Sequence, residues 1–156
     1  MTIVGFGRAR FAALVIVATT GAVQTGALAQ QAPSVPEVFQ KYNLIGTFAW
    51  DCSKPASPNN LYFVNRVLGA NHVQRDIMDG PSSSQHVTIL SSAAETKPNE
   101  IAVSGTLDGS KPVTGVWRIE GVRMVPIEAT ESGRKIVADQ KILATGSELP
   151  WLSKCD

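Results

Sequence analysis

Alternation of apolar and polar residues with a period of two is the feature that most constrains how this chain folds. It is clear where Ile101 and Val103 alternate with Glu100 and Ser104. Side chains of a β-strand point alternately to the two sides of a sheet, so this pattern predicts strands with one buried face. The predicted strands cover residues 44–52, 60–67, 71–78, 86–93, 99–107, 113–119, 122–130 and 134–143.

Short connections separate these eight segments, and Asp108-Gly109 is a strong turn signal. Eight short strands with tight connections are typical of an antiparallel meander. A meander of this size closes most simply into a barrel, because closure removes the two exposed edges of the sheet. The predicted fold class is therefore an all-β, eight-stranded antiparallel barrel, and a two-sheet β-sandwich is the alternative.

One short helix is expected ahead of the strands. Ser34 and Glu37 have the spacing of a capping box, and Val38, Phe39 and Tyr42 follow at helical spacing. Val, Ile, Thr and Gly dominate the later segments, and no stripe with a period of 3.6 residues occurs there. The rest of the chain is therefore expected to contain no further helix.

A short helix that leads into "LIGTFAW" and an eight-stranded meander resembles the lipocalin-like barrels. That family opens with a Gly-x-Trp element after such a helix. Gly46 matches the glycine, Phe48 stands at the place of the tryptophan, and Trp50 follows on the same face. The resemblance implies the barrel fold more than any particular ligand. The segment "WDCSKPASPNN" is also similar to one in small secreted proteobacterial proteins of unassigned function, which implies export and no activity.

The first residues have the layout of a secretory signal peptide. Arg8 and Arg10 precede an uncharged, mostly apolar run over residues 11–23, and a small-x-small pattern ends at Ala29. The run is shorter than the roughly 20 apolar residues of a membrane span. The expected organisation is a signal peptide over 1–29, a flexible leader over 30–36 and a single β-barrel domain over 37–156. Cleavage near Ala29 would leave no membrane span and a periplasmic or secreted protein.

Cys52 and Cys155 are the two cysteines of the chain. Export exposes them to an oxidising compartment, so they are predicted to form a disulfide bond. The Cys52 sulfur is expected to point toward a barrel mouth. The C-terminal segment should then cross that mouth, with Trp151 or Leu152 as an apolar plug.

Composition and motifs give little support for other functional classes. The net charge is +1, with 14 basic and 13 acidic residues and no basic cluster, so no nucleic-acid partner is expected. The common catalytic and phosphate-binding signatures are absent from the sequence, so neither enzymatic activity nor a cofactor is predicted. Ser84 and His86 could form a catalytic dyad, but no third group that would orient them can be named. Asp76 and Asp79 could form a pair of catalytic carboxylates, but a strand end that runs into a turn explains them better. The cysteines and histidines do not have the spacing of metal ligands.

Aromatic and long apolar residues on predicted inward faces are the candidates for ligand binding. They either fill the barrel or line a cavity in it, and the sequence leaves both alternatives open. The candidate ligand-binding residues are Phe48, Trp50, Phe63, Trp117 and Met124.

A two-residue hairpin loop at Glu120-Gly121 would place Trp117 opposite Met124 and Arg118 opposite Arg123. Two facing arginines could hold a carboxylate or a phosphate. The alternative is that Arg118 and Arg123 splay apart and pair with nearby glutamates.

Two functional hypotheses follow. The first is a secreted or periplasmic binding protein that carries a small apolar or amphipathic ligand inside a β-barrel. The second is a protein-interaction or inhibitor module of the cell envelope, with an envelope protein as partner, acting through loops 53–60 and 79–86. Loops on rigid scaffolds commonly carry such functions.

Overall fold

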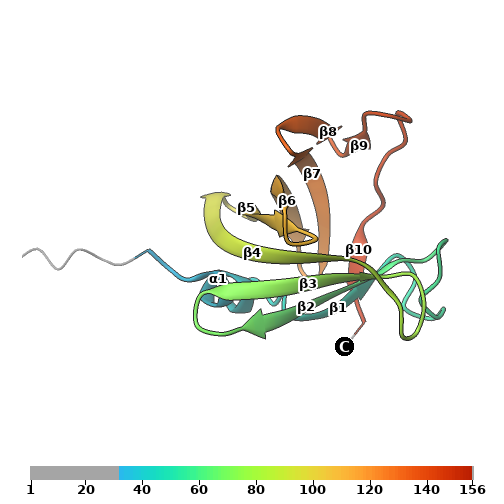
Figure 1. Ribbon diagram of the computed structural model, residues 1–156, viewed down its shortest axis with the longest axis horizontal. Coiled ribbons are helices and arrows are strands. Elements are labelled where there is room, and N and C mark those ends of the chain that lie inside the picture. The colour runs from blue at the N-terminus through green and yellow to red at the C-terminus, as the bar shows by residue number, and fades with distance from the viewer. Residues whose placement is uncertain (1–31, 156) are drawn as a thin grey trace, which may run out of the picture. The chain divides into compact units, whose positions relative to one another are not determined.

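A computed structural model describes residues 32–155, and the predicted signal peptide lies outside them. The described residues form one helix and ten strands (Figure 1). These elements are α1 (Val35–Lys41), β1 (Gly46–Ala49), β2 (Tyr62–Leu68), β3 (His72–Met78), β4 (Ser84–Lys97), β5 (Glu100–Leu107), β6 (Lys111–Glu120), β7 (Arg123–Glu131), β8 (Arg134–Ala138), β9 (Lys141–Ile142) and β10 (Leu152–Lys154).

Helix α1 begins with the predicted capping box. The backbone N–H of Glu37 donates to Ser34 Oγ at 3.4 Å, and the backbone N–H of Ser34 donates to the Glu37 carboxylate at 2.7 Å. These bonds satisfy two N–H groups that have no partner within the helix. Val35 and Pro36 are buried in the first turn, so the helix begins two residues before the predicted start of the domain. Val38 and Phe39 continue its buried face.

The strands form one antiparallel sheet that closes on itself. Each of β1 to β7 pairs with the next strand in sequence, and β10 pairs with both β7 and β1. The ring β1–β2–β3–β4–β5–β6–β7–β10 is an eight-stranded barrel, which confirms the predicted fold class. Closure leaves these strands without a free edge along the paired segments.

The eighth strand of the ring is not the predicted one. Residues 134–143 were expected to close the barrel, but β8 and β9 form an extension beside the second half of β7 (Figure 1). The first half of β7 instead pairs with β10, where Leu152 lies opposite Met124. One edge of β7 is thus shared between two partners, which a strand-by-strand reading of the sequence does not reveal.

Strand β4 has 14 residues and changes direction along its length. Its pairing with β5 shifts register between Leu90 and Ser92 and again between Glu95 and Lys97. Such bulges increase the local bend and twist of a strand, which a small barrel needs in order to close. Gly105 of β5 lies at the first bulge, where a Cβ atom would be only 2.1 Å from the carbonyl oxygen of Ile89.

The core fills one part of the barrel and includes the buried face of α1. Its most deeply buried apolar side chains are Phe39, Leu44, Phe48, Val73, Leu90, Ile101 and Met124.

The predicted disulfide bond between Cys52 and Cys155 is present, with Cα atoms 5.3 Å apart and a sequence separation of 103. It joins the residues that follow β1 and β10, which are neighbours in the sheet. Cys52 is exposed, so its sulfur does not point into a barrel mouth as predicted. The segment before Cys155 forms strand β10 of the barrel and does not cross a barrel mouth as predicted. Leu152 is buried in the core, while Trp151 is half-buried beside Arg123.

Candidate functional site

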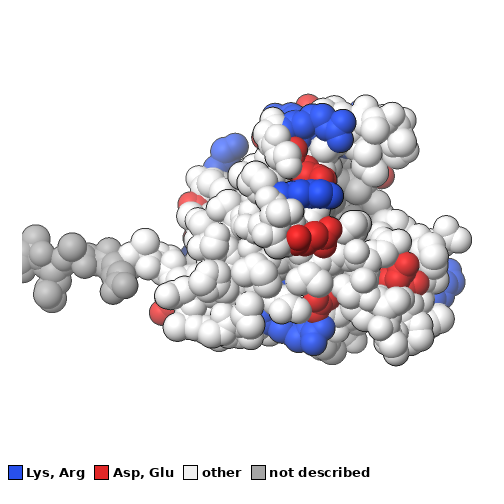
Figure 2. All heavy atoms as spheres, in the orientation of Figure 1, with Lys and Arg blue, Asp and Glu red and all other residues white. Residues whose placement is uncertain are grey.

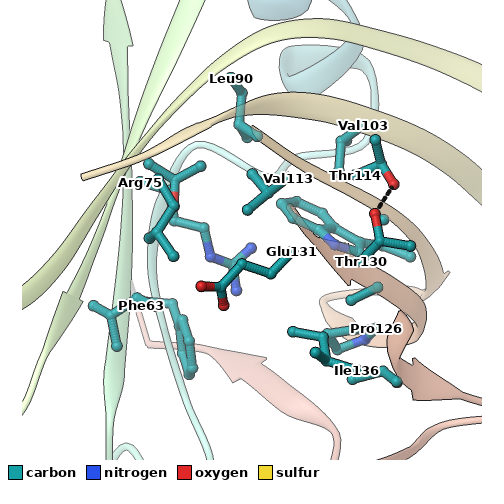
Figure 3. Close-up of a pocket in the computed structure, with 17 residues that line it drawn as sticks. Phe63, Arg75, Leu90, Val103, Val113, Thr114, Pro126, Thr130, Glu131 and Ile136 are labelled. Carbon is teal, nitrogen blue, oxygen red and sulfur yellow. Dashed lines mark hydrogen bonds between the residues drawn. The ribbon is translucent and has the colours of Figure 1, made fainter. Parts of the chain in front are cut away.

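A pocket of about 210 Å³ lies inside the barrel (Figure 3). Strands β2 to β8 all contribute to its wall, and most of the lining side chains are apolar. Leu90, Val113 and Pro126 are representative lining residues, and the pocket is partly open to solvent. The core side chains therefore do not fill the interior of the barrel completely.

Arg75 reaches into this pocket from β3. Its position follows from strand alternation, because Val73, Arg75 and Ile77 point to the same inner side of the barrel. The guanidinium carbon lies 4.6 Å from the ring centroid of Phe63 and 4.4 Å from that of Trp117. Both distances are within the range of cation–π interactions.

Phe63 and Trp117 approach Arg75 from opposite walls. Phe63 belongs to β2 and Trp117 to β6, and these strands are four positions apart in a ring of eight. Strands related in this way stand across the barrel from each other. The guanidinium of Arg75 therefore lies between two aromatic side chains near the middle of the barrel.

Nη1 of the Arg75 guanidinium has no hydrogen-bond acceptor among the residues that the structure describes. Arg75 is 6% exposed, its Nη1 atom is buried and unpartnered, and it forms no ion pair with any described residue. Glu131 is the one carboxylate among the described lining residues, and it pairs instead with Lys111 at 3.6 Å. Burial lowers the pKa of Arg75 to about 9, so the group is charged at neutral pH.

Polar side chains occur on the pocket wall formed by β6 and β7. The hydroxyl groups of Thr114 and Thr130 are hydrogen-bonded at 2.6 Å, as Figure 3 shows. Gly115 lies next to Thr114, and a Cβ atom there would be 3.3 Å from Nε1 of Trp117. The glycine thus leaves space for the indole ring that forms part of the wall.

Two of the five predicted ligand-binding residues line the pocket. These are Phe63 and Trp117. Phe48 and Met124 are each 1% exposed and belong to the packed core, away from the pocket lining. Trp50 follows the end of β1 and is 38% exposed, so it does not continue the inward face of that strand as predicted. The two alternatives, packed core and cavity, each describe part of the interior.

The predicted pairing of Arg118 with Arg123 is wrong. The loop of this hairpin is Gly121-Val122 rather than Glu120-Gly121, because Gly121 adopts a positive φ of 59° at the first central position. Arg118 therefore lies opposite Val125, and Arg123 lies opposite Glu120.

Each of these arginines has an acidic partner. Arg118 donates to Glu100 from Nε at 3.2 Å and from Nη2 at 3.0 Å, while Arg123 donates to Glu120 at 3.1 Å. The two residues do not form an anion site. On the face shown in Figure 2, acidic and basic side chains are likewise interspersed with each other.

The hairpin contains a second departure from the predicted register. The pairing shifts between Val116 and Trp117, which places Trp117 opposite Pro126 rather than Met124. Proline has no N–H to donate to a strand ladder, so it is compatible with an irregularity at this point.

Arg75 was missed by the sequence analysis. The signal that could have identified it is the inward register of residues 71–78, in which one charged residue stands between Val73 and Ile77. A charged side chain in an otherwise apolar register indicates either a buried partner or a functional site.

The polar residues considered from the sequence have partners other than each other's side chains. Ser84 Oγ donates to the backbone oxygen of His86 and not to its ring, while the His86 ring contacts Asp108 at 2.8 Å. Asp76 forms an ion pair with Arg66, and Asp79 accepts a hydrogen bond from Ser83. Within residues 32–155, no group of three or more His, Cys, Asp or Glu side chains is arranged to hold a metal ion.

The two predicted interaction loops are mostly exposed and internally bonded. In loop 53–60, the side-chain amide of Asn60 donates to the backbone oxygens of Asp51, Lys54 and Pro55 at 2.9 to 3.3 Å. In loop 79–86, the hydrogen bond between Ser83 and Asp79 measures 2.7 Å. Neither loop contributes to the wall of the pocket.

Helix α1 is far too short to cross a membrane, and no helix in the described part of the chain meets the length and hydropathy required for a span.

The chain matches no protein-family model, no curated protein and no solved structure.

Proposed function

We propose that this protein binds and carries a small, mostly apolar ligand inside its barrel. The observation that supports the proposal is the interior pocket, which is lined by apolar side chains and bordered by Phe63 and Trp117. Pockets of this kind, with few polar groups among many apolar ones, are typical of small-molecule sites.

The size of the pocket limits the ligand. Its volume of about 210 Å³ is below the range of roughly 300–1,000 Å³ that is usual for drug-sized ligands. A single aromatic ring with a short substituent, or a short aliphatic chain, is the appropriate scale. A longer ligand would leave part of its length outside the open side of the pocket.

We also propose that the protein works in the periplasm or outside the cell after removal of residues 1–29. The disulfide bond between Cys52 and Cys155 supports an oxidising compartment. The location is tested by expressing the full chain in a proteobacterial host and measuring the mass of the product in the periplasm and the medium. Retention of the uncleaved chain in the cytoplasm would contradict it.

Ligand binding is best tested by fluorescence of a Trp50→Phe/Trp151→Phe variant, in which Trp117 is the remaining tryptophan. Small aromatic and aliphatic compounds should change the emission of Trp117 in a saturable manner. Native mass spectrometry of the protein from its own host provides a second readout, because a carried ligand would add mass to the bare polypeptide.

A pocket-filling variant supplies the control. Ala129→Leu adds a larger side chain to the pocket wall and should weaken binding, whereas Ala94→Leu changes an exposed position outside this pocket and should not. A bare polypeptide mass, together with no response of Trp117 to any compound, would contradict the proposed function.

The interaction hypothesis keeps one supporting observation, which is the way Asn60 fixes loop 53–60. A loop held in one conformation loses little entropy when it binds a partner. Replacing residues 53–59 by Gly and Ser should then abolish capture of an envelope protein by the folded chain, with a replacement of the β8–β9 connection as control. Capture that survives the first replacement would exclude this loop as the interaction surface.

A further inference from the structure

We propose that the ligand carries a carboxylate group, and that this group binds the guanidinium of Arg75 inside the barrel. The inference rests on the proposed function and names the chemical class of the ligand. It would assign the carried molecule as a small organic acid with an apolar body.

An unpaired charge at Arg75 is costly to bury. Arg75 is 6% exposed and has a buried Nη1 atom without an acceptor. Burying a charged group without a partner is strongly unfavourable, and an apolar residue of similar length would avoid this cost. Buried charges that lack a structural partner are therefore candidates for ligand binding.

The geometry around the guanidinium suits a carboxylate. Phe63 and Trp117 contact it from opposite walls, at 4.6 and 4.4 Å from their ring centroids. Aromatic contacts of this type commonly stack on the flat faces of a guanidinium, so its in-plane N–H groups need other partners. A carboxylate matches these groups, because its two oxygens can accept two parallel hydrogen bonds.

The distribution of charge in the pocket fits a ligand with one anionic group. Glu131 lines the same pocket (Figure 3), but it is paired with Lys111 and forms no ion pair with Arg75. Apart from Thr88, which lies opposite Arg75 on β4, the wall near Arg75 is apolar and includes Ile77 and Leu90. An anionic head beside Arg75 and an apolar body against these side chains would satisfy both kinds of surface.

The test compares acids with their neutral amides in the Trp50→Phe/Trp151→Phe background. The probes are benzoate against benzamide, hexanoate against hexanamide, and inorganic phosphate, each titrated at constant ionic strength. Each acid should bind at least about tenfold more tightly than its amide, which is the scale of a charge-assisted hydrogen bond. Phosphate, which lacks an apolar body, should bind more weakly than either acid.

Arg75→Met keeps an unbranched side chain and removes the charge. This variant should lose the preference for acids and still bind the amides. Its thermal unfolding midpoint should rise, because an unpaired buried charge has been replaced by an apolar group. Lys97→Met removes one positive charge from a side chain that is 74% exposed, and it should retain the preference.

The outcomes separate this inference from the proposed function. Equal binding of acids and amides, a preference that survives Arg75→Met, or phosphate binding as tight as that of benzoate would overturn the carboxylate assignment alone. A lower unfolding midpoint for Arg75→Met would also count against it, because the guanidinium would then have a structural role. No response to any acid or amide would overturn the proposed function itself.

Discussion

Phe39 of α1 and Trp117 of β6 pack edge to face, with ring centroids 5.7 Å apart and planes inclined by 68°. The same indole ring contacts the guanidinium of Arg75. The N-terminal helix therefore contacts the wall of the pocket through this aromatic pair. Edge-to-face contacts stabilise aromatic pairs beyond the burial of their area.

Phe39→Ala should lower the free energy of unfolding by about 3–5 kcal/mol, the usual range for removing a buried phenylalanine. Phe39 is fully buried, so the substitution leaves a cavity beside Trp117. Urea denaturation provides the measurement, and Phe39→Leu is the control with a smaller expected loss. A loss below about 1 kcal/mol for Phe39→Ala would show that α1 does not support the barrel.

The disulfide bond should stabilise barrel closure, because β10 has only three residues and pairs with both β1 and β7. Cys52→Ser/Cys155→Ser should cost about 2–5 kcal/mol. Truncation after Pro150 should cost at least as much, since it removes β10 together with the bond. Thermal melting with and without reductant checks this, and the double variant should not respond to reductant. Identical melting of the oxidised and reduced protein would contradict the prediction.

Gly105→Ala should destabilise the barrel by at least about 3 kcal/mol, the upper part of the range for overpacking. The added methyl group would meet the backbone of Ile89 at the bulge of β4, and backbone atoms there cannot rotate away. Gly109→Ala is the control, because that position has open space and only a positive φ of 73°. Its cost should be about 1–2 kcal/mol. Chemical denaturation of both variants measures the difference, and equal costs would show that β4 can shift at the bulge.

Asp51 should titrate with a pKa of about 2 in the folded protein, below its ordinary value of 3.8. Hydrogen bonds from the hydroxyl and the backbone N–H of Ser53 lower the pKa, together with Lys54 at 2.9 Å. A lowered carboxyl pKa means that the stabilisation is fully present above about pH 4 and is lost as the pH falls through about 2.

NMR of the side-chain carboxyl carbon measures this titration. Ser53→Ala should raise the pKa of Asp51 toward 3.8, because it removes the hydroxyl donor. Asp51→Asn should remove this part of the pH dependence of unfolding. An Asp51 pKa that does not change in Ser53→Ala would show that the hydroxyl is not the principal cause.

The sequence by itself determined the features that depend on neighbouring residues. The capping box of α1 is local, because Ser34 and Glu37 bond to each other's backbone within one turn. Seven of the barrel strands were predicted because the two-residue alternation records burial on one face. The disulfide bond followed from having one possible pair, Cys52 and Cys155.

The tertiary structure decided the features that depend on residues far apart in the chain. The final strand of the ring is β10, whose three residues are too few for a periodic pattern to be visible. The hairpin register of Arg118 and Arg123 is a local feature, but it also became clear only in the structure, because it depended on a shift of a single residue at Gly121. A shift of one position changes every cross-strand partner, and a sequence pattern with a period of two does not specify the turn.

The pocket is the clearest case of this second kind. Phe63, Arg75 and Trp117 lie on three strands, and only closure of the ring places β2 opposite β6 with the Arg75 side chain between them. The alternation indicated which way each side chain points, but not which side chains meet. That depends on the number of strands in the ring and on the curvature that the bulges of β4 impose.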